Sequence, residues 1–303
     1  MTQINRADLA DYAYFIEIAK HRSFRKAATE LGVSASALSH AISGLEGRLG
    51  VRLLNRTTRS VTLTAAGEEL MASIEEPLRR IGQAAEDLNR FRDQPAGRVR
   101  INVLEDAVSM ILAPVLPVFV ERYPEVEIDI SVNNKLIDVI GGGFDAGIRY
   151  GGTVPEDMIA QRLSADIRWV AAASPDYLRR FGRPAHPNDL QHHHCVRIRL
   201  GNDHIYQWEF ERDGEAIHVA TPGQVTVDES HAAISFGLGG VGIVYGAEPI
   251  LRPYLERGEL ELVLDDWAPM GSGYHIYYSS RRHVPTGLRL LIDLIRELRP
   301  LDM

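Results

Sequence analysis

Apolar side chains in the first fifty residues recur every three or four positions, which is the spacing of one face of an α-helix. The pattern predicts three helices, the second beginning after Ser23 and the third after Ser34, because serine is a favourable N-cap residue. Gly32 separates these two helices and allows a sharp turn, since glycine accepts positive φ without strain. Two helices joined by a short glycine-containing turn form a helix-turn-helix. The apolar positions are Leu9, Tyr12, Ala13, Phe15, Ile16 and Ala19 in the first helix, Phe24, Ala27, Ala28 and Leu31 in the second, and Leu38, Ile42, Leu45 and Leu49 in the third.

Small polar side chains occupy the face of the third helix opposite its apolar stripe. Small side chains let a helix enter the major groove of DNA, and hydroxyl groups offer donors and acceptors to base edges and phosphates. The alternative is that these serines only contact water, but their position on the second helix of the pair favours DNA. The candidate DNA-binding residues of this helix are Ser34, Ala35, Ser36, Ser39, His40 and Ser43.

Two short alternating segments, residues 51–54 and 60–63, follow the third helix and predict the two strands of a wing. Arg56 and Arg59 lie in the turn between them, where guanidinium groups suit a phosphate or the minor groove. Arginines on a turn are also often only solvated, and this alternative stays open. Residues 1–66 are therefore predicted to form an all-α winged helix-turn-helix that binds DNA.

A long helix is predicted after Thr64, over residues 67–93. Its apolar positions alternate between spacings of three and four, which is the heptad pattern of a helix that pairs with another helix. Packing on its own domain is the alternative, but no adjacent element of the same chain is evident, so the pattern favours a homodimer. The apolar positions are Met71, Ile74, Leu78, Ile81, Ala85 and Leu88.

From residue 98 onward, segments with strand and helix patterns alternate. Alternation of this kind builds a largely parallel sheet with helices on both faces, so residues 94–303 are predicted to form an α/β domain. Ligands of such sheets bind beyond the carboxyl ends of the strands. The predicted strands are residues 99–103, 126–132, 146–149, 168–173, 224–227 and 242–245, and the predicted helices are residues 107–122, 135–140, 175–181 and 230–237.

Charge is distributed unevenly along the 303-residue chain, whose net charge is −8. Residues 1–66 carry nine Lys and Arg against five acidic residues, a net +4, whereas residues 67–93 carry −3 and the remainder −9. A basic head on an acidic body is typical of a DNA-binding module joined to a separate sensory domain. Cys195 is the only cysteine, no apolar run reaches the ~18 residues of a membrane span, and no signal-peptide pattern is found. These features predict a cytoplasmic protein without a membrane segment.

The order and spacing of these residues resemble those of the LysR-type transcriptional regulators. Leu54 departs from the family pattern by replacing a phenylalanine, which keeps the position apolar, and His40 stands where longer polar or basic side chains often occur. The resemblance rests on Ser23, Phe24, Ala27, Ala28, Leu31, Ser34, Ser36, Ala37, Leu38, Ser39, Ile42, Leu45, Glu46, Leu49, Gly50, Leu53, Arg56, Arg59, Leu63, Thr64 and Gly67, and in the C-terminal region on Pro114, Phe119, Tyr123, Pro124, residues 144–149, Asp189, Leu190, Trp208, Phe210, Gly239, Gly242 and Ile243.

The resemblance implies a two-lobed effector domain similar to type 2 periplasmic binding proteins. Lobe one is expected at about residues 98–163 and 268–300, and lobe two at about residues 164–267. A homotetramer of two linker-paired dimers is expected to bind an interrupted pseudo-palindrome in double-stranded DNA, because a two-fold protein matches a two-fold site. A small-molecule effector between the lobes then changes DNA bending and the access of RNA polymerase.

Candidate effector-binding residues follow the predicted strands of both lobes. Arg149 suits a carboxylate bidentately, although pairing with Asp145 or Glu156 explains it equally well. Asp106 stands at a helix start that favours anions, which points instead to an effector with hydroxyl or amine groups. The candidates are Asp106, Ala107, Val108, Asn133, Asn134, Arg149, Gly201, Asn202, His204, Asp228, Glu229 and Tyr245.

Other motifs favour simpler interpretations. Residues 237–242 fit GxGxxG by letter, but a helix precedes them and a strand follows, the reverse of a dinucleotide site. Residues 192–195, His-His-His-Cys, are contiguous and do not converge easily on one metal ion. No GxSxG, HExxH or Walker motif is present, so no catalytic residue, cofactor or metal is predicted. An enzyme on a solute-binding fold and an architectural DNA-binding protein without a ligand are the rival interpretations.

Overall fold

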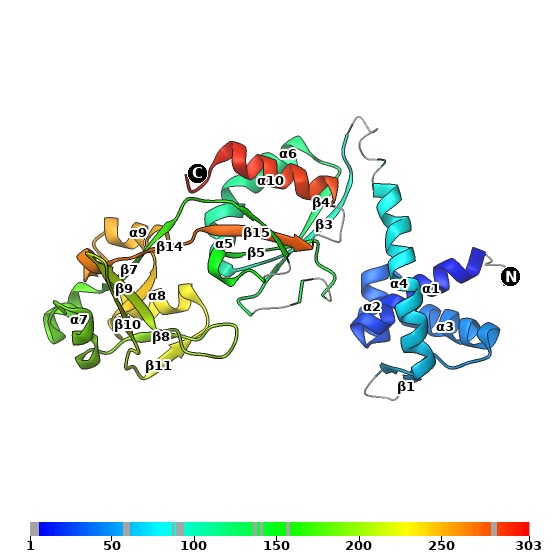
Figure 1. The fold of residues 1–303 in the computed structure, drawn as a ribbon, viewed down its shortest axis with the longest axis horizontal. Helices are drawn as coiled ribbons and strands as arrows, with labels where there is room; N and C mark the ends of the chain where they lie inside the picture. Colours follow the sequence, from blue (N-terminus) through cyan, green and yellow to red (C-terminus); the bar gives the residue numbers. More distant parts are fainter. Residues whose placement is uncertain are drawn as a thin grey trace. The chain divides into compact units, whose positions relative to one another are not determined.

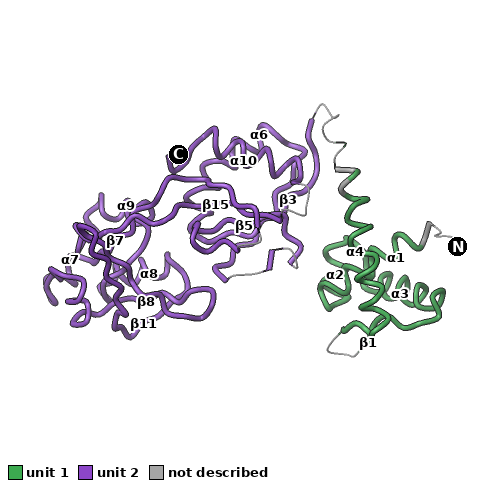
Figure 2. Tube along the Cα trace, viewed as in Figure 1, with its two compact units in different colours: residues 1–91 green, residues 92–303 purple. Residues whose placement is uncertain are grey.

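The computed structural model describes residues 6–56, 61–86, 88, 94–135, 138–139, 142–155, 158–279 and 284–302. The chain divides into two compact units, residues 1–91 and residues 92–303 (Figure 2). Each unit has its own apolar core and is described by itself below. None of the helices within the described residues combines the length and the apolar character needed to cross a membrane.

Unit 1 begins with the three predicted helices, α1 (Arg6–His21), α2 (Phe24–Leu31) and α3 (Ala35–Leu49). The predicted caps are present: Ser23 Oγ accepts from the Lys26 amide at 3.3 Å, and Ser34 Oγ accepts from the Ala37 amide at 3.1 Å. Gly32 ends α2 with φ of 65°, so the turn uses the conformation that glycine allows. The core between these helices buries Phe15, Ile18, Leu38, Ile42 and Leu45 completely.

The wing strands β1 (Leu54–Arg56) and β2 (Val61–Leu63) pair antiparallel, with Leu54 opposite Leu63 and Arg56 opposite Val61. Residues 51–54 were predicted to form the first strand, but the strand begins three positions later, at Leu54. Glu46 on α3 explains the later start, because its Oε1 accepts the amides of Leu53 and Leu54, at 2.9 and 3.1 Å, where the strand begins. Arg56 therefore lies in the strand and not at the turn, and Arg59 lies outside the described residues.

Helix α4 (Ala65–Glu86) begins at Thr64, whose Oγ1 accepts the Gly67 amide at 3.0 Å. Its first apolar positions, Met71, Ile74 and Leu78, pack against the core of unit 1, beside α1. The expectation that no element of the same chain lies beside this helix was wrong for these three residues. Farther along, Ile81 and Leu88 are each 60 % exposed.

Lobe one of unit 2 is built on a five-stranded sheet in the order β4-β3-β5-β15-β6 (Figure 1). The strands are β3 (Gly97–Val103), β4 (Val126–Val132), β5 (Ala146–Tyr150), β6 (Met158–Arg162) and β15 (Tyr274–Ser279). Strand β3 pairs in parallel with β4 and β5, whereas β15 runs antiparallel to its neighbours. After β3 a continuous helical segment comprises α5 (Glu105–Ala107), the π-helix η2 (Val108–Leu112) and α6 (Ala113–Arg122), and α6 packs beside α10 (Thr286–Leu298).

Lobe two is centred on β7 (Ile167–Ala173), to which β12 (Val244–Ala247), β13 (Glu261–Val263) and β14 (Met270–Gly271) pair antiparallel. The prediction of a largely parallel sheet holds for β3, β4 and β5 and for the pair of β8 (Val196–Ile198) with β11 (Val225–Val227), but was wrong for the sheet around β7, where strands far apart in sequence pair antiparallel. The remaining strands of lobe two are β9 (Trp208–Arg212) and β10 (Glu215–Val219), and its helices are α7 (Pro175–Phe181), α8 (Ser230–Leu238) and α9 (Glu248–Glu256). Unit 2 also contains short 3₁₀ helices at Gly151–Thr153, between β5 and β6, and at Pro187–His192 and Asp265–Trp267.

The two lobes are linked twice, between β6 and β7 and between β14 and β15. The helix expected over residues 135–140 was wrong, since the described residues 135, 138 and 139 are not helical. Asn133 Oδ1 instead accepts the Lys135 amide at 2.9 Å, a local turn that competes with helix formation.

The glycine-rich segment after α8 is the predicted helix-to-strand turn. Gly240 has φ of 71° between the end of α8 and β12. A Cβ on Gly237 would lie 2.6 Å from Val244 Cγ1, so close packing of α8 on β12 requires glycine there. The segment therefore serves the packing of lobe two.

Candidate functional site

The polar face of α3 is accessible in unit 1. Leu38, Ile42 and Leu45 point into the core, while Ser36, His40 and Ser43 are exposed on the other side. The Ser34 and Ser36 hydroxyl oxygens lie 3.0 Å apart, at the start of the helix. The remaining predicted residues, Ala35 and Ser39, are exposed and half-buried respectively.

Arg56 extends across this face from β1. Its Nη1 lies 3.4 Å from both Ser39 Oγ and Ser43 Oγ, and its Nη2 donates to Glu46 Oε2 at 2.9 Å. Its guanidinium also lies over the Phe24 ring, with 5.1 Å from Cζ to the ring centroid. Sequence reasoning placed Arg56 apart from the serines, whereas the fold joins them into one polar surface with a positive charge, which we call the α3 surface.

A cavity of about 230 Å³ lies between the two lobes of unit 2. Charged and amide side chains from both lobes line it, and the lobes are joined at its edge by a 2.8 Å hydrogen bond from Asn134 Nδ2 to the Asp228 carbonyl. Five of the predicted effector residues line this interlobe cleft: Asn133, Asn134, Gly201, Asp228 and Glu229.

Arg149 lies beneath the cleft and is only 2 % exposed. Its guanidinium donates to the carbonyls of Asn102, Ile148, Asn133 and Lys135 and to the Asn102 side chain. Burial lowers the pKa of this guanidinium. These contacts hold the strand ends together, and they account for the position of Arg149 better than an effector carboxylate does.

The other predicted residues lie apart from the cleft lining. The Tyr245 hydroxyl donates to the Glu209 carbonyl at 2.7 Å, and its ring stacks between Trp169 and Trp208 in lobe two. Asn202 Oδ1 accepts the His204 amide at 3.2 Å in an exposed loop. Ala107 is buried and Val108 half-buried on the helix below Asp106.

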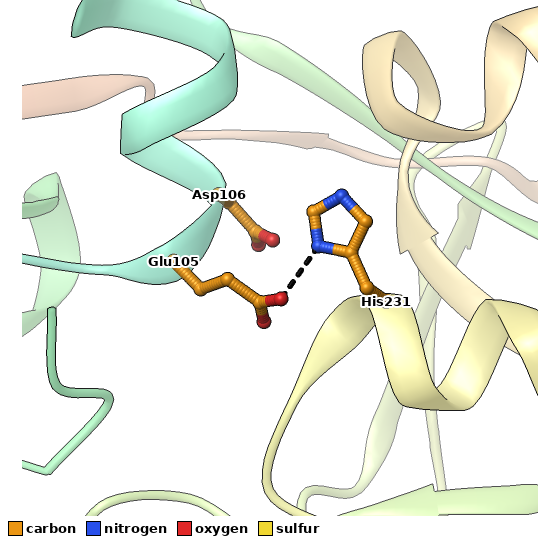
Figure 3. A group of neighbouring side chains, drawn as sticks. All are labelled: Glu105, Asp106 and His231. Carbon is orange, nitrogen blue, oxygen red and sulfur yellow. Dashed lines mark hydrogen bonds and ion pairs between the residues drawn. The ribbon is translucent and has the colours of Figure 1, made fainter.

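Asp106 is buried, 7 % exposed, at the junction of the lobes. Its Oδ2 accepts from the Tyr150 hydroxyl at 3.1 Å and from the Ser230 hydroxyl at 3.0 Å. Burial raises the pKa of the Asp106 carboxyl. It also raises the pKa of the Glu105 carboxyl, which is less deeply buried. Figure 3 shows Glu105 and Asp106 on α5 facing His231 on α8, with Glu105 Oε1 2.7 Å from His231 Nδ1.

Two family models match the chain. The bacterial regulatory helix-turn-helix model of the lysR family covers residues 9–68, and the LysR substrate binding domain covers residues 92–300. The chain belongs to the LysR family of transcriptional regulators.

Relatives within the LysR family match over almost the whole chain. The uncharacterized HTH-type transcriptional regulator YcaN of Escherichia coli K12 is 36 % identical, over 96 % of this chain and 95 % of that protein. The HTH-type transcriptional regulator PgrR of the same strain is 35 % identical, over 97 % and 98 %. The full-length structure of the Vibrio cholerae virulence activator AphB has a TM-score of 0.68 at 25 % identity and covers 96 % of this chain and 99 % of that one.

Sequence reasoning missed several residues of the LysR effector domain that line or border the cleft. Glu105, Lys135, Arg199 and Asp203 line it, and His231 borders it. Glu105 and His231 were recognisable, since Glu105 is next to Asp106 and His231 is two positions after Glu229, each near the start of a predicted helix. Lys135 was not, because residues 135–140 were expected to form a helix, and Arg199 was not, because it reaches the cleft through the pairing of β8 with β11.

Proposed function

We propose that this LysR-family regulator binds a specific DNA sequence through the α3 surface and responds to a small polar molecule in the interlobe cleft. Residues 1–66 would contact DNA, residues 67–93 would pair two chains, and residues 94–303 would sense the effector. The observation that supports this best is a cleft lined by charged and amide groups from two lobes, which a purely architectural DNA-binding protein has no use for.

The α3 surface supports sequence-specific recognition because it combines hydroxyl groups, an imidazole and one guanidinium on an accessible helix. Ser39 and His40 are the residues proposed to read bases. Arg56 is proposed to meet a phosphate beside them, and Arg59 is proposed to do so from the wing. Binding measurements on single-base variants of a selected DNA site test this proposal, with Ser39→Ala and His40→Ala as variants.

The cleft supports an effector with groups of both charges. Glu105 and Glu229 lie in the lining together with Lys135 and Arg199, so opposite ends of one small molecule would find partners. A carboxylate, if present, would bind Lys135 and Arg199, because Arg149 already donates to backbone carbonyls. The volume of about 230 Å³ lies below the ~300–1,000 Å³ of drug-sized sites, which favours a small metabolite.

Assembly is proposed to use Ile81, near the end of α4, and Leu88, two residues beyond that helix; both are exposed and continue the heptad pattern of the sequence. Two such dimers would form a homotetramer on an interrupted pseudo-palindrome, in the cytoplasm, where effector binding alters the access of RNA polymerase. The LysR-family relatives are named as transcriptional regulators, and that supports regulation as the activity in place of catalysis.

A thermal-shift screen of the full chain against cytoplasmic metabolites tests the effector proposal, with DNA affinity measured for every compound that stabilises the protein. We expect at least one compound that stabilises the protein and also changes its DNA affinity. The double variant Asn134→Ala with Asp228→Ala should bind that compound more weakly, while its DNA affinity in the absence of the compound should be unchanged. A compound that binds without any effect on DNA affinity would contradict it.

A further inference from the structure

Glu105, Asp106 and His231 gather at the junction of the lobes, with one ligand atom of each residue lying within 4.8 Å of the others (Figure 3). Two of these side chains come from α5 of lobe one and the third from α8 of lobe two. One nitrogen and two carboxylate oxygens from two rigid helices form a donor set that first-row transition-metal ions accept.

A second observation concerns the unused oxygen atoms of this cluster. Asp106 Oδ1 and Glu105 Oε2 are buried, and no hydrogen-bond donor reaches either of them among the residues that the structure describes. The hydroxyl groups of Tyr150 and Ser230 both donate to Asp106 Oδ2, so Oδ1 is the oxygen that remains without a donor within the described residues. A buried carboxylate oxygen without a donor destabilises the protein unless a cation or a donor is supplied.

An ordinary ion pair explains only part of this arrangement. The contact between Glu105 and His231 accounts for one oxygen and one nitrogen, but it leaves Asp106 Oδ1 without a partner among the described residues. Glu229 lines the cleft beside Glu105, so three carboxyl groups and one imidazole gather at this junction. The cluster therefore offers more carboxylate ligands than its one imidazole can pair with.

We propose that Glu105, Asp106 and His231 bind one divalent transition-metal ion, Zn²⁺ being the best fit, at the junction of the lobes. A tetrahedral ion about 2.1 Å from each ligand requires ligand atoms about 3.4 Å apart. The three ligand atoms here lie within 4.8 Å of one another, so small side-chain movements would bring them to that spacing. Water or an effector group would complete the coordination. The proposal concerns metal binding itself and holds whether or not the protein responds to an organic effector.

The chemistry of the donors decides among cations. Mg²⁺ and Ca²⁺ prefer oxygen ligands and many of them, whereas the imidazole of His231 suits Zn²⁺, Mn²⁺ or Fe²⁺. Since the ion would join α5 to α8, it would also hold lobe one against lobe two. The π-helix η2 immediately after Ala107 fits a functional locus, because π-bulges are frequent at such sites.

Calorimetric titration of ZnCl₂ into the tag-free, chelator-treated full chain tests the proposal. We expect each chain to bind one Zn²⁺ ion tightly, and we expect no comparable binding when MgCl₂ is titrated instead. His231→Gln and Asp106→Asn should each weaken Zn²⁺ binding at least tenfold, while His231→Cys, which keeps a zinc ligand, should retain it. Circular dichroism of each variant checks that the fold is intact, and the Asp106 variant decides the matter if the His231 variants do not fold.

The matched control is His194→Gln, an exposed histidine in the run at residues 192–194. Its Zn²⁺ binding should equal that of the unaltered chain. Loss of binding in His194→Gln with retention in His231→Gln would place the ion at the histidine run and overturn the proposal. Absence of any tight equivalent, or stabilisation of the chain by organic amines and not by Zn²⁺, would overturn it too. DNA binding is not part of this readout, so its outcome leaves the proposed regulatory function to be tested separately.

Discussion

At the scale of one residue, Asp106 is a buried carboxyl group at the junction of the lobes whose hydrogen bonding is incomplete among the described residues. The carboxylate lies at the junction of two lobes, almost fully buried, with two donors on Oδ2 and none on Oδ1 within the described part of the chain. Buried charge without full compensation is unfavourable and is usually retained at binding sites.

Replacing Asp106 by asparagine should therefore stabilise the metal-free protein. The amide removes the buried charge, and the Tyr150 and Ser230 hydroxyl groups can still bond to its oxygen. We expect a gain of about 1 kcal/mol, or roughly 2–4 °C in Tm. Asp203→Asn, an exposed residue of the same cleft, is the control and should change Tm little. A lower Tm for Asp106→Asn would mean that the carboxylate itself stabilises the domain.

Arg56 is the residue of the α3 surface with the clearest electrostatic role. Its removal would take one positive charge from the surface and leave the Glu46 carboxylate, its partner at 2.9 Å, facing DNA. Arg56→Ala should weaken binding to specific and random DNA alike and reduce the slope of affinity against salt by about one. Ser39→Ala and His40→Ala should instead lose ~1–3 kcal/mol at one base position.

Binding titrations at several salt concentrations distinguish these effects. Lys20→Ala on α1, where the lysine pairs with Glu17 and Glu75, is the control with the same loss of charge. An unchanged salt slope for Arg56→Ala would show that this arginine only braces β1 against α3.

Single residues were the hardest to assign from the sequence. Ser23, Ser34 and Gly32 were recognisable because a cap depends on neighbours within four positions. Arg149 was not, since its partners are carbonyls at residues 102, 133, 135 and 148, which only the folded sheet brings together. The strand-end rule located part of the cleft lining, but it also included Tyr245, whose ring is used in the core of lobe two.

At the scale of elements, the apolar positions of the predicted linker helix differ in burial. Ile74 and Leu78 pack on unit 1, whereas Ile81 and Leu88 are exposed and available to a second chain. Ile81→Asp with Leu88→Asp should therefore abolish dimers and reduce DNA affinity without lowering the Tm of unit 1, since burial of such side chains contributes roughly 1.5–3 kcal/mol each. Sedimentation and calorimetry measure the two quantities.

The matched variant is Leu78→Asp, which should lower the Tm of unit 1 by breaking packing within the same chain. If the Ile81 and Leu88 variant keeps its mass and its DNA affinity, these two residues do not pair chains.

Elements with local signals were predicted well. The ends of β4 and α7 agree with the expected residues 126–132 and 175–181, because the apolar periodicity and the flanking turns define them. The antiparallel pairing of β7 with β12 and β13 was not predictable, since these strands are separated by about seventy residues or more of chain and no local rule orders them. The start of strand β1 was predicted three residues too early, because the amides of Leu53 and Leu54 donate to Glu46, a residue of α3.

At the scale of the whole molecule, we propose that the relative position of the two lobes controls DNA binding by unit 1. Such coupling is typically worth a factor of about 5–150 in affinity. The hydrogen bond from Asn134 to the Asp228 carbonyl marks a place where the lobes are already in contact. Cys195, the single cysteine, is buried and its pKa is raised to about 12, so it stays out of thiol exchange.

The most direct test is therefore a reversible lock between the lobes, made by Asn134→Cys with Asp228→Cys in the full chain. DNA affinity is measured on one selected site, with the cysteine pair oxidised and then reduced, and each single-cysteine variant serves as the control. The account predicts that oxidation changes DNA affinity at least fivefold and that reduction restores it, while the single variants do not respond. Equal affinity of the oxidised and reduced double variant, with the disulfide shown to be complete by mass spectrometry, would contradict the claim.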